Sequence, residues 1–266
     1  MPDYTVNVGN VEMISLHDGI STGNPLDTFP DTTIEQWREV PGILDENDQT
    51  AGRMGTTAVR SGGKLIVVDT GLQLPGAPLM DELKAKSVDR DAVDLVVFTH
   101  LHPDHIGWNL IDGKPTFPNA RYLAPRQDWD YWSKPSVLEK AAFIGDQMVP
   151  LDDLDILDLM DDGYNVTNEM TAVLTPGHTP GHMSFAIASN GERGYILGDV
   201  AGNPIQAYFT DWCATYDQDK DAARATRHTV LDGLEADGSM VSAGHFPDPG
   251  FGRFVRIEGK RYWQGV

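Results

Sequence analysis

The sequence contains a single cysteine, Cys213, and no hydrophobic run long enough to cross a membrane. One cysteine excludes an intrachain disulfide and leaves no Cys-x-x-Cys metal or redox site. A membrane-spanning helix needs about 18–20 predominantly apolar residues, and no segment approaches this length. The first residues, MPDYTVNVGN, lack the basic and apolar regions of a secretory signal. We therefore expect a globular cytoplasmic protein that does not enter a membrane.

Basic residues are also scarce. Twenty Lys and Arg residues face 40 acidic ones, and the formal net charge is −20. Such a surface repels phosphate backbones, so a nucleic-acid partner is disfavoured. The most acidic stretch, DDLDILDLMDD at 152–162, lacks the Gly and the closing Glu of an EF-hand loop. Its spaced Leu and Ile residues instead predict one buried face and one solvated acidic face.

Alternating β-rich and helical segments run along the whole chain. The sequence predicts strands at YTVNVGN and VEMISLHDG, and hairpins in TTAVRSGGKLIVVDTG, MSFAIASNGERGYILGD and FVRIEGKRYWQ. Helical patterns are expected over residues 77–88, 126–132, 135–148 and 218–236. Two β-rich halves that each carry helices indicate a layered α/β sandwich with its sheets inside, in one domain over residues 1–266.

Residues 22–53 form a long segment without a regular pattern. They are rich in Pro, Asp and Thr, and they carry Phe29 and Trp37. A long loop of this kind is commonly a lid or a substrate wall. We therefore expect this segment to cover a binding site.

Polar side chains with metal-binding chemistry come directly after four β-rich runs. DLVVF leads into THLHPDH, AVLTPG and MVSAG are each followed by a histidine, and GYILG is followed by an aspartate. The C-terminal ends of strands are where α/β sheets place their functional sites. The candidate metal ligands are His100, His102, Asp104, His105, His178, Asp199 and His245.

The spacing within THLHPDH divides its four candidates into two groups. In an extended segment, residues i and i+2 point the same way, so His100 and His102 can chelate one ion. Asp104 and His105 follow where Pro103 turns the chain into a helix. They project in a different direction and suit a second ion.

The remaining candidates complete these two groups. His178 can join the first group and His245 the second, while the two oxygens of the Asp199 carboxylate can bridge both ions. Imidazole and carboxylate ligands without a thiolate suit two Zn²⁺ ions first, with Mn²⁺, Fe²⁺ or Co²⁺ as alternatives. We interpret His182 and His228 as structural, although His182 lies close enough to His178 in sequence to support the ligands.

The segments VVDTG, THLHPDH, TPGHTPGH, LGD and AGH occur in this order, and together they resemble the signature of the metallo-β-lactamase superfamily. The resemblance extends over nearly the whole chain. It implies a four-layer αββα sandwich with a metal site at one edge, between the two sheets. It also implies the same two groups of ligands, bridged by Asp199, and it adds Asp69 as a residue that orients the ligand loop.

This resemblance implies a hydrolase. Two divalent ions about 3.5–4 Å apart lower the pKa of a shared water, so that a metal-bound hydroxide attacks the substrate at neutral pH. No nucleophile motif such as G-x-S-x-G occurs in the chain. By the role that the family assigns to its ligand at this position, Asp104 is the catalytic candidate for proton transfer to the leaving alcohol.

Within the superfamily, the chain resembles quorum-quenching lactonases and methyl-parathion-hydrolase-like enzymes, through HPDHIGWN and TPGHTPGH. We expect it to cleave a lactone or other carboxylic ester of a hydrophobic small molecule. The first alternative is a phosphotriester or aryl-ester hydrolase with the same metal centre. A mononuclear-iron oxygenase of the persulfide dioxygenase type is an alternative of another class, although it uses fewer ligands. The oligomeric state stays open, with a homodimer as one option.

The resemblance departs from the lactonases at one position. Gly202 stands three residues after Asp199, where acyl-homoserine-lactone lactonases carry a Tyr that hydrogen-bonds the substrate carbonyl. This departure weakens the case for that particular substrate but not for a hydrolase. Core packing is the alternative role for each aromatic residue that we expect in the pocket wall, namely Phe29, Trp37, Trp108, Phe246 and Phe251.

Overall fold

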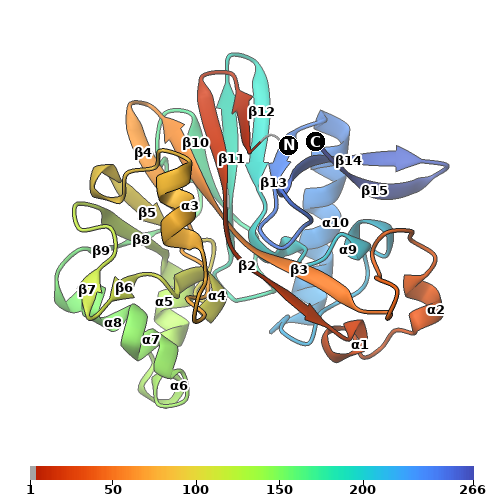
Figure 1. The fold of residues 1–266 in the computed structure, drawn as a ribbon, viewed down its shortest axis with the longest axis horizontal. Helices are drawn as coiled ribbons and strands as arrows, with labels where there is room; N and C mark the ends of the chain where they lie inside the picture. Colours follow the sequence, from red (N-terminus) through yellow and green to blue (C-terminus); the bar gives the residue numbers. More distant parts are fainter. Residues whose placement is uncertain (1–3) are drawn as a thin grey trace.

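The computed structural model describes residues 4–266, and it contains two large β-sheets packed face to face with helices on both outer faces (Figure 1). This arrangement confirms the predicted αββα sandwich. The first sheet has the strand order β1-β2-β3-β4-β5-β8-β9. Its strands are β1 (Thr5–Val8), β2 (Val11–Gly23), β3 (Thr50–Ser61), β4 (Lys64–Val68), β5 (Leu95–Val97), β8 (Arg121–Pro125) and β9 (Leu157–Met160).

The second sheet has the strand order β10-β11-β12-β13-β14-β15. All its neighbouring strands are antiparallel except β12 and β13, which are parallel. Its strands are β10 (Met170–Leu174), β11 (Met183–Ser189), β12 (Glu192–Ile196), β13 (Met240–Ser242), β14 (Phe251–Ile257) and β15 (Lys260–Gly265). A small third sheet pairs β6 (Leu110–Ile111) with β7 (Lys114–Pro115).

The side chains of the first sheet alternate between two separate cores. In β2, Met13 packs into the core between the sheets, whereas Ile14 and Leu16 face the helices. In β8, Leu123 faces the second sheet and Tyr122 faces the helices. Side chains of a strand point alternately to opposite faces, so a sheet buried on both faces needs nearly continuous apolar runs. The sequences KLIVV and RYLAP meet this requirement.

The helices divide between the two outer faces. Figure 1 shows α3 to α8 on the side of the first sheet and α9 and α10 on the side of the second. Among the described residues, none of the helices is long and apolar enough to span a membrane. The helices are α1 (Pro25–Thr28), α2 (Ile34–Trp37), α3 (Leu79–Ala85), α4 (Pro103–Ile106), α5 (Arg126–Trp132), α6 (Pro135–Leu138), α7 (Ala142–Gln147), α8 (Val149–Asp153), α9 (Ile205–Tyr208) and α10 (Lys220–Asp237).

Most predicted helices are present, and one is divided. The patterns over 126–132 and 218–236 correspond to α5 and α10. The helix predicted over 135–148 is instead two short helices, α6 and α7. Ala141 separates them with a non-helical backbone (φ −116°, ψ 63°), and its buried methyl group packs in the outer core. A tertiary contact of this kind overrides a local helical pattern.

The segment over residues 22–53 is more regular than its sequence indicated. β2 continues to Gly23 and β3 begins at Thr50, so these strands form a long hairpin whose tip carries α1 and α2 (Figure 1). The rings of Phe29 and Trp37 lie 6.2 and 5.5 Å from that of Trp212, which belongs to the second half of the chain. Helices of four residues are unstable alone, so this aromatic packing stabilises them, and sequence periodicity could not reveal it.

Candidate metal centre

The segment THLHPDH leaves the first sheet at the end of β5 and enters α4. His100 and His102 lie in the extended part, and Pro103 occupies the first turn of α4. Asp104 and His105 follow on the helix, so they project in another direction. Gly107 ends this turn close to the preceding loop, where a Cβ atom would lie 2.5 Å from the carbonyl carbon of Leu72. The segment therefore packs in one defined conformation.

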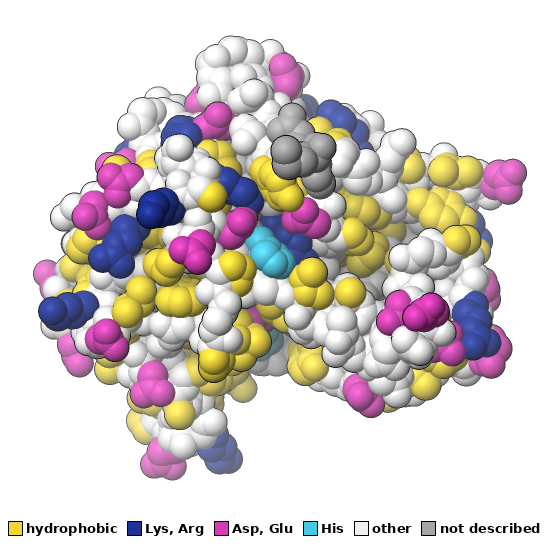
Figure 2. All heavy atoms as spheres, in the orientation of Figure 1, with side chains coloured by type: hydrophobic (Ala, Val, Ile, Leu, Met, Phe, Trp, Pro, Cys, Tyr) yellow, Lys and Arg dark blue, Asp and Glu magenta, His cyan; other side chains and the backbone are white. Residues whose placement is uncertain are grey.

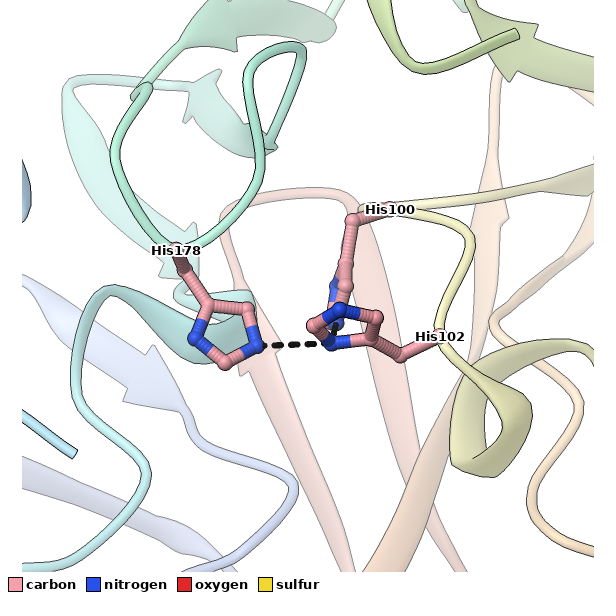
Figure 3. Close-up of side chains that lie close together, drawn as sticks. All are labelled: His100, His102 and His178. Atoms are coloured by element: carbon pink, nitrogen blue, oxygen red, sulfur yellow. Dashed lines mark hydrogen bonds between the residues drawn. The ribbon is translucent and has the colours of Figure 1, made fainter. Parts of the chain in front are cut away.

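Three histidines form a first cluster. Figure 3 shows the rings of His100, His102 and His178 directed toward one another, from the loop after β5 and the loop after β10. His102 Nδ1 lies 3.1 Å from His100 Nε2 and 2.9 Å from His178 Nε2. Donor atoms so close to one another can share one cation.

Asp104, His105 and His245 form a second cluster beside the first. Asp104 Oδ2 lies 3.4 Å from His245 Nε2 and 3.7 Å from His105 Nε2. His245 reaches this point from the loop that follows β13. One carboxylate and one imidazole from α4 thus meet an imidazole from the loop after β13.

Asp199 lies between the clusters and faces each with a different oxygen. Its Oδ2 is 3.3 Å from His178 Nε2 in the first cluster. Its Oδ1 is 3.3 Å from His245 Nε2 and 3.5 Å from His105 Nε2 in the second. This is the geometry expected of a carboxylate that bridges two cations. The structure therefore brings together all seven residues that the sequence singled out.

The charges of the two clusters suit cations. Burial and the neighbouring imidazoles lower the pKa of His102 to about 3, and they lower the pKa of His100 well below its ordinary value. Both rings are therefore neutral at pH 7 and present lone pairs. Burial also lowers the pKa of His245, but the carboxylates of Asp199 and Asp104 outweigh it and raise this pKa to about 9. The carboxylates that stabilise a positively charged imidazole there would also stabilise a metal cation.

Two buried atoms in the centre support this interpretation. Among the described residues, His105 Nε2 and Asp199 Oδ1 have no hydrogen-bond partner, although both are buried. Buried polar atoms are nearly always paired, so two unpaired atoms with lone pairs that face each other at 3.5 Å fit a site for a cation. The donor set, five imidazoles and two carboxylates without a thiolate, fits two zinc-like ions.

The opposite nitrogens of the ligand rings are held by other residues. Asp69 Oδ2 accepts from His105 Nδ1 at 2.8 Å, and its Oδ1 accepts from the Thr99 amide at 2.8 Å. His245 Nδ1 donates to the Arg53 carbonyl at 2.9 Å. Such bonds fix the tautomer and orientation of a metal-binding ring. Asp69 thus lies where the family resemblance placed it, at the base of the ligand loop.

Three supporting residues escaped the sequence reasoning or were only partly recognised. Asp128 is fully buried and accepts from the Leu101 amide at 3.1 Å and the Gly181 amide at 2.7 Å, which ties the two histidine loops together. His182 Nε2 accepts from the Asp199 amide at 2.8 Å. Asp217 accepts from His178 Nδ1 at 2.9 Å. A second histidine in TPGHTPGH was a signal for His182, whereas nothing local distinguishes Asp128 or Asp217 from surface acids.

Five of the seven residues of the clusters line a cavity of about 570 Å³, namely His102, Asp104, His178, Asp199 and His245. The hairpin formed by β2 and β3 supplies one wall, which includes Phe29, Trp37 and Met54. The segment after Asp199 supplies another, which includes Gly202. Phe29, Trp37 and Gly202 therefore lie at the cavity, and their role in substrate binding stays a prediction.

The other three predicted wall residues lie elsewhere, and the expectation for them is wrong. Phe246 is buried against Trp263, with the ring centroids 4.8 Å apart. Phe251 is buried in the core between the sheets. Trp108 packs against the outer core and donates from Nε1 to Asp18 at 2.7 Å. Each follows a metal ligand closely in sequence or lies near its loop, but its side chain points away from the cavity.

The fold and the site together define a class of α/β sandwich proteins with paired metal-binding clusters at the edge between two sheets. The sequence model of the metallo-beta-lactamase superfamily matches residues 56–245 of this chain. The chain therefore belongs to the metallo-beta-lactamase superfamily.

Several characterised proteins are similar to this chain. The N-acyl homoserine lactonase AttM of Agrobacterium fabrum (strain C58) is 34% identical over 122 residues, which are 44% of this chain and 44% of the relative. An N-acyl homoserine lactonase of Bacillus thuringiensis is 21% identical over 167 residues, which are 63% of this chain and 61% of the relative. The chain thus matches less than two thirds of the length of these curated relatives.

Two solved structures show the same fold over nearly the whole chain. The hydrolase AbOPH of the beta-lactamase superfamily superposes with a TM-score of 0.88 at 25% identity, and the match covers 99% of this chain and 97% of that one. AidC, a dizinc quorum-quenching lactonase solved with a bound product, gives a TM-score of 0.85 at 23% identity and covers 98% and 96%.

Proposed function

We propose that this protein is a hydrolase that holds two divalent metal ions, zinc in the first instance, and cleaves a lactone or other carboxylic ester of a hydrophobic small molecule. One observation carries the proposal: seven imidazole and carboxylate donors form two clusters that share Asp199 at the end of a partly apolar cavity. When bound, the ions supply an activated water and polarise the scissile carbonyl group.

Asp104 is the residue best placed to move a proton. Its carboxylate is partly exposed, and it lines the cavity beside His245 and Asp199. A carboxylate at this position can hold a metal ion with one oxygen and pass a proton to the leaving alcohol with the other. His100 and His105 are fully or nearly buried behind it, so they act as ligands only.

The walls of the cavity favour an apolar substrate. Phe29, Trp37 and Met54 line one side, and Leu72 lies nearby. On the other side, the amides of Gly202 and Asn203 both donate to Gln206 Oε1, at 2.9 and 3.2 Å. These two amides are therefore not free to bind a substrate oxygen. The chain's part in substrate binding is mainly apolar contact and exclusion of water.

The relatives support an ester or lactone. AttM and the Bacillus thuringiensis relative are N-acyl homoserine lactonases, and AidC is a dizinc lactonase. Gly202 favours a second candidate, a phosphotriester or aryl-ester hydrolase, because this position offers the cavity no hydroxyl group for a lactone carbonyl. The same centre can serve either reaction.

Metal analysis and a substrate panel test these alternatives. We expect about two zinc-like ions per chain, and hydrolysis of acyl lactones or aliphatic esters with a preference for apolar groups. A single iron with oxygen uptake on persulfide would assign the protein to the oxygenase class. If phosphotriesters such as paraoxon react while every lactone and carboxylic ester is inert, the second candidate replaces the first.

The partners, assembly and location of the protein stay predictions. On the face shown in Figure 2, basic side chains are interspersed with acidic and apolar ones. With a net charge of −20, we expect no nucleic-acid partner. Single-domain behaviour over residues 1–266, a homodimeric assembly and a cytoplasmic location are further expectations. Light scattering and unfolding experiments test the first two.

A further inference from the structure

Arg227 lies in the centre of a buried network behind the metal clusters. It belongs to α10, and its side chain is 1% exposed. Its Nε donates to the Val200 carbonyl at 2.7 Å, and its Nη1 donates to the Trp212 and Thr210 carbonyls at 2.7 and 3.2 Å. Its Nη2 donates to Asp217 Oδ2 at 3.2 Å. One guanidinium group therefore holds four acceptors from three separate stretches of chain.

Asp217 extends this network to a metal ligand. While Oδ2 accepts from Arg227 and from the Ala214 amide, Oδ1 accepts from His178 Nδ1 at 2.9 Å. A bond to Nδ1 leaves the Nε2 lone pair for a cation. The neighbouring amide of Gln218 also donates to the His178 carbonyl, at 3.1 Å. Both the ring and the backbone of His178 are thus held from this segment.

The contact with Val200 reaches a second metal ligand. Val200 directly follows Asp199 in the short helical turn Gly198–Val200, which lies after β12. His178 belongs to a different loop, after β10. Arg227 therefore joins the loop of His178, through Asp217, to the turn of Asp199, in addition to the direct bond from the Asp199 amide to His182. It lies outside the set of residues that line the cavity, so it has no direct contact with a substrate.

The shape of the guanidinium group is suited to this position. Its donors form a rigid planar fork, whereas a lysine ammonium is a single point with a flexible stem. Three of the four oxygen acceptors are neutral backbone carbonyls. A positive charge without directed N–H groups would not bind all three of them. The network therefore depends on geometry as well as on charge.

We propose that Arg227 and Asp217 are positioning residues that set the separation of His178 and Asp199, and so determine the affinity of the first cluster for its ion. This inference rests on the proposed metal centre. It concerns how the centre is held, not which substrate is cleaved.

Zinc affinity, measured by competition with a chromophoric chelator, tests the proposal. Loss of a residue that orients a ligand typically weakens metal binding by about 10–100-fold. We expect this loss at one of the two sites in Asp217→Asn and in Arg227→Lys, with the other site changed far less. Wild-type affinity in Arg227→Lys would show that charge alone suffices and would overturn the proposal. Wild-type affinity in Asp217→Asn would overturn it as well.

Two further variants separate positioning from stability. Arg227→Met leaves the Asp217 carboxylate buried without its partner, which destabilises the fold. The double variant Arg227→Met/Asp217→Asn removes both charges, so we expect it to recover melting temperature relative to Arg227→Met but to keep the weakened zinc site. Recovery of zinc affinity together with melting temperature would overturn the proposal.

Arg261 provides a matched control. It is also buried, it pairs with Asp232 and Glu235 of α10, and it donates to Thr210 Oγ1 at 3.3 Å, but it contacts neither Asp217 nor a candidate metal ligand. We expect Arg261→Met to lower the melting temperature and leave zinc affinity unchanged; an equal loss of zinc affinity would show a general loosening and refute the positioning role. If the wild-type protein binds no zinc, the proposed function fails, whereas two tight sites unaffected by the variants refute only the positioning role.

Discussion

The two clusters of the centre differ in charge, although side chains of both line the cavity. The first is formed by three imidazoles, and its only carboxylate is the shared Asp199. The second adds Asp104, whose side chain is 25% exposed, whereas His100 in the first cluster is fully buried. Under the proposed function both clusters would hold an ion, and only the second would offer a carboxylate of its own, Asp104, that can exchange a proton with a substrate. The predictions below test this division of labour.

The largest effect is expected where the clusters meet. Asp199→Ala removes the one residue that faces both, and it should lower metal content and activity together. The rate should fall by about a thousandfold or more, since metal-ion catalysis contributes several kcal/mol. Metal analysis and kinetics on the same preparation measure both effects. Full activity at normal metal content would refute the bridging role.

Asp104→Asn tests the second cluster alone. The amide keeps the shape of the carboxylate but cannot carry a proton to the leaving group. We expect kcat to fall by about a hundredfold or more, the usual contribution of general acid–base catalysis, with a smaller change in KM. An unchanged kcat would refute the proton-transfer role of Asp104. Neither cluster would then supply the proton for the leaving group.

Asp69→Asn reaches the second cluster indirectly. Asp69 accepts from His105 Nδ1 and also anchors Thr99, so its loss should weaken that cluster's zinc affinity by about 10–100-fold. The chelator competition proposed for Asp217→Asn measures this effect as well. If Asp69→Asn and Asp217→Asn weaken the same site, the assignment of separate supports to the two clusters is wrong.

The smallest effect is expected at the cavity wall. Phe29→Leu should raise KM for apolar substrates by about threefold to tenfold, which corresponds to about 1 kcal/mol of lost contact. Metal content should stay at two ions. Phe246→Leu is the control, because Phe246 is buried outside the cavity and should affect stability alone. Equal KM changes in both variants would show that the wall assignment is wrong.

The sequence predicted the fold and the grouping of the seven candidate ligands because both depend on local patterns. Strand ends carry the ligands, and alternate residues of an extended segment share a direction, so THLHPDH was sufficient to divide His100 and His102 from Asp104 and His105. Asp217 could not be found in this way, because it contacts His178 across 39 residues of sequence. Only the folded chain reveals that contact.

The aromatic residues expected in the cavity wall show more clearly what the sequence cannot predict. Phe246 follows a ligand directly, which made it a candidate, yet adjacent residues project in different directions and its ring packs against Phe254 and Trp263. Phe29 and Trp37 are far from every ligand in sequence, but the hairpin of β2 and β3 brings them to the cavity. Proximity in sequence to a metal ligand is therefore a poor guide to a substrate-binding role.

The long hairpin of β2 and β3 has a consequence for how this protein can diverge. Its base is an integral part of the first sheet, while its tip, with α1 and α2, lies against the second half of the chain. None of the seven metal ligands belongs to it. Insertions or deletions at the tip would therefore reshape the cavity wall while leaving the seven candidate ligands on other elements. Under the proposed function, this arm is where a change of sequence would alter substrate preference while the candidate ligands are retained.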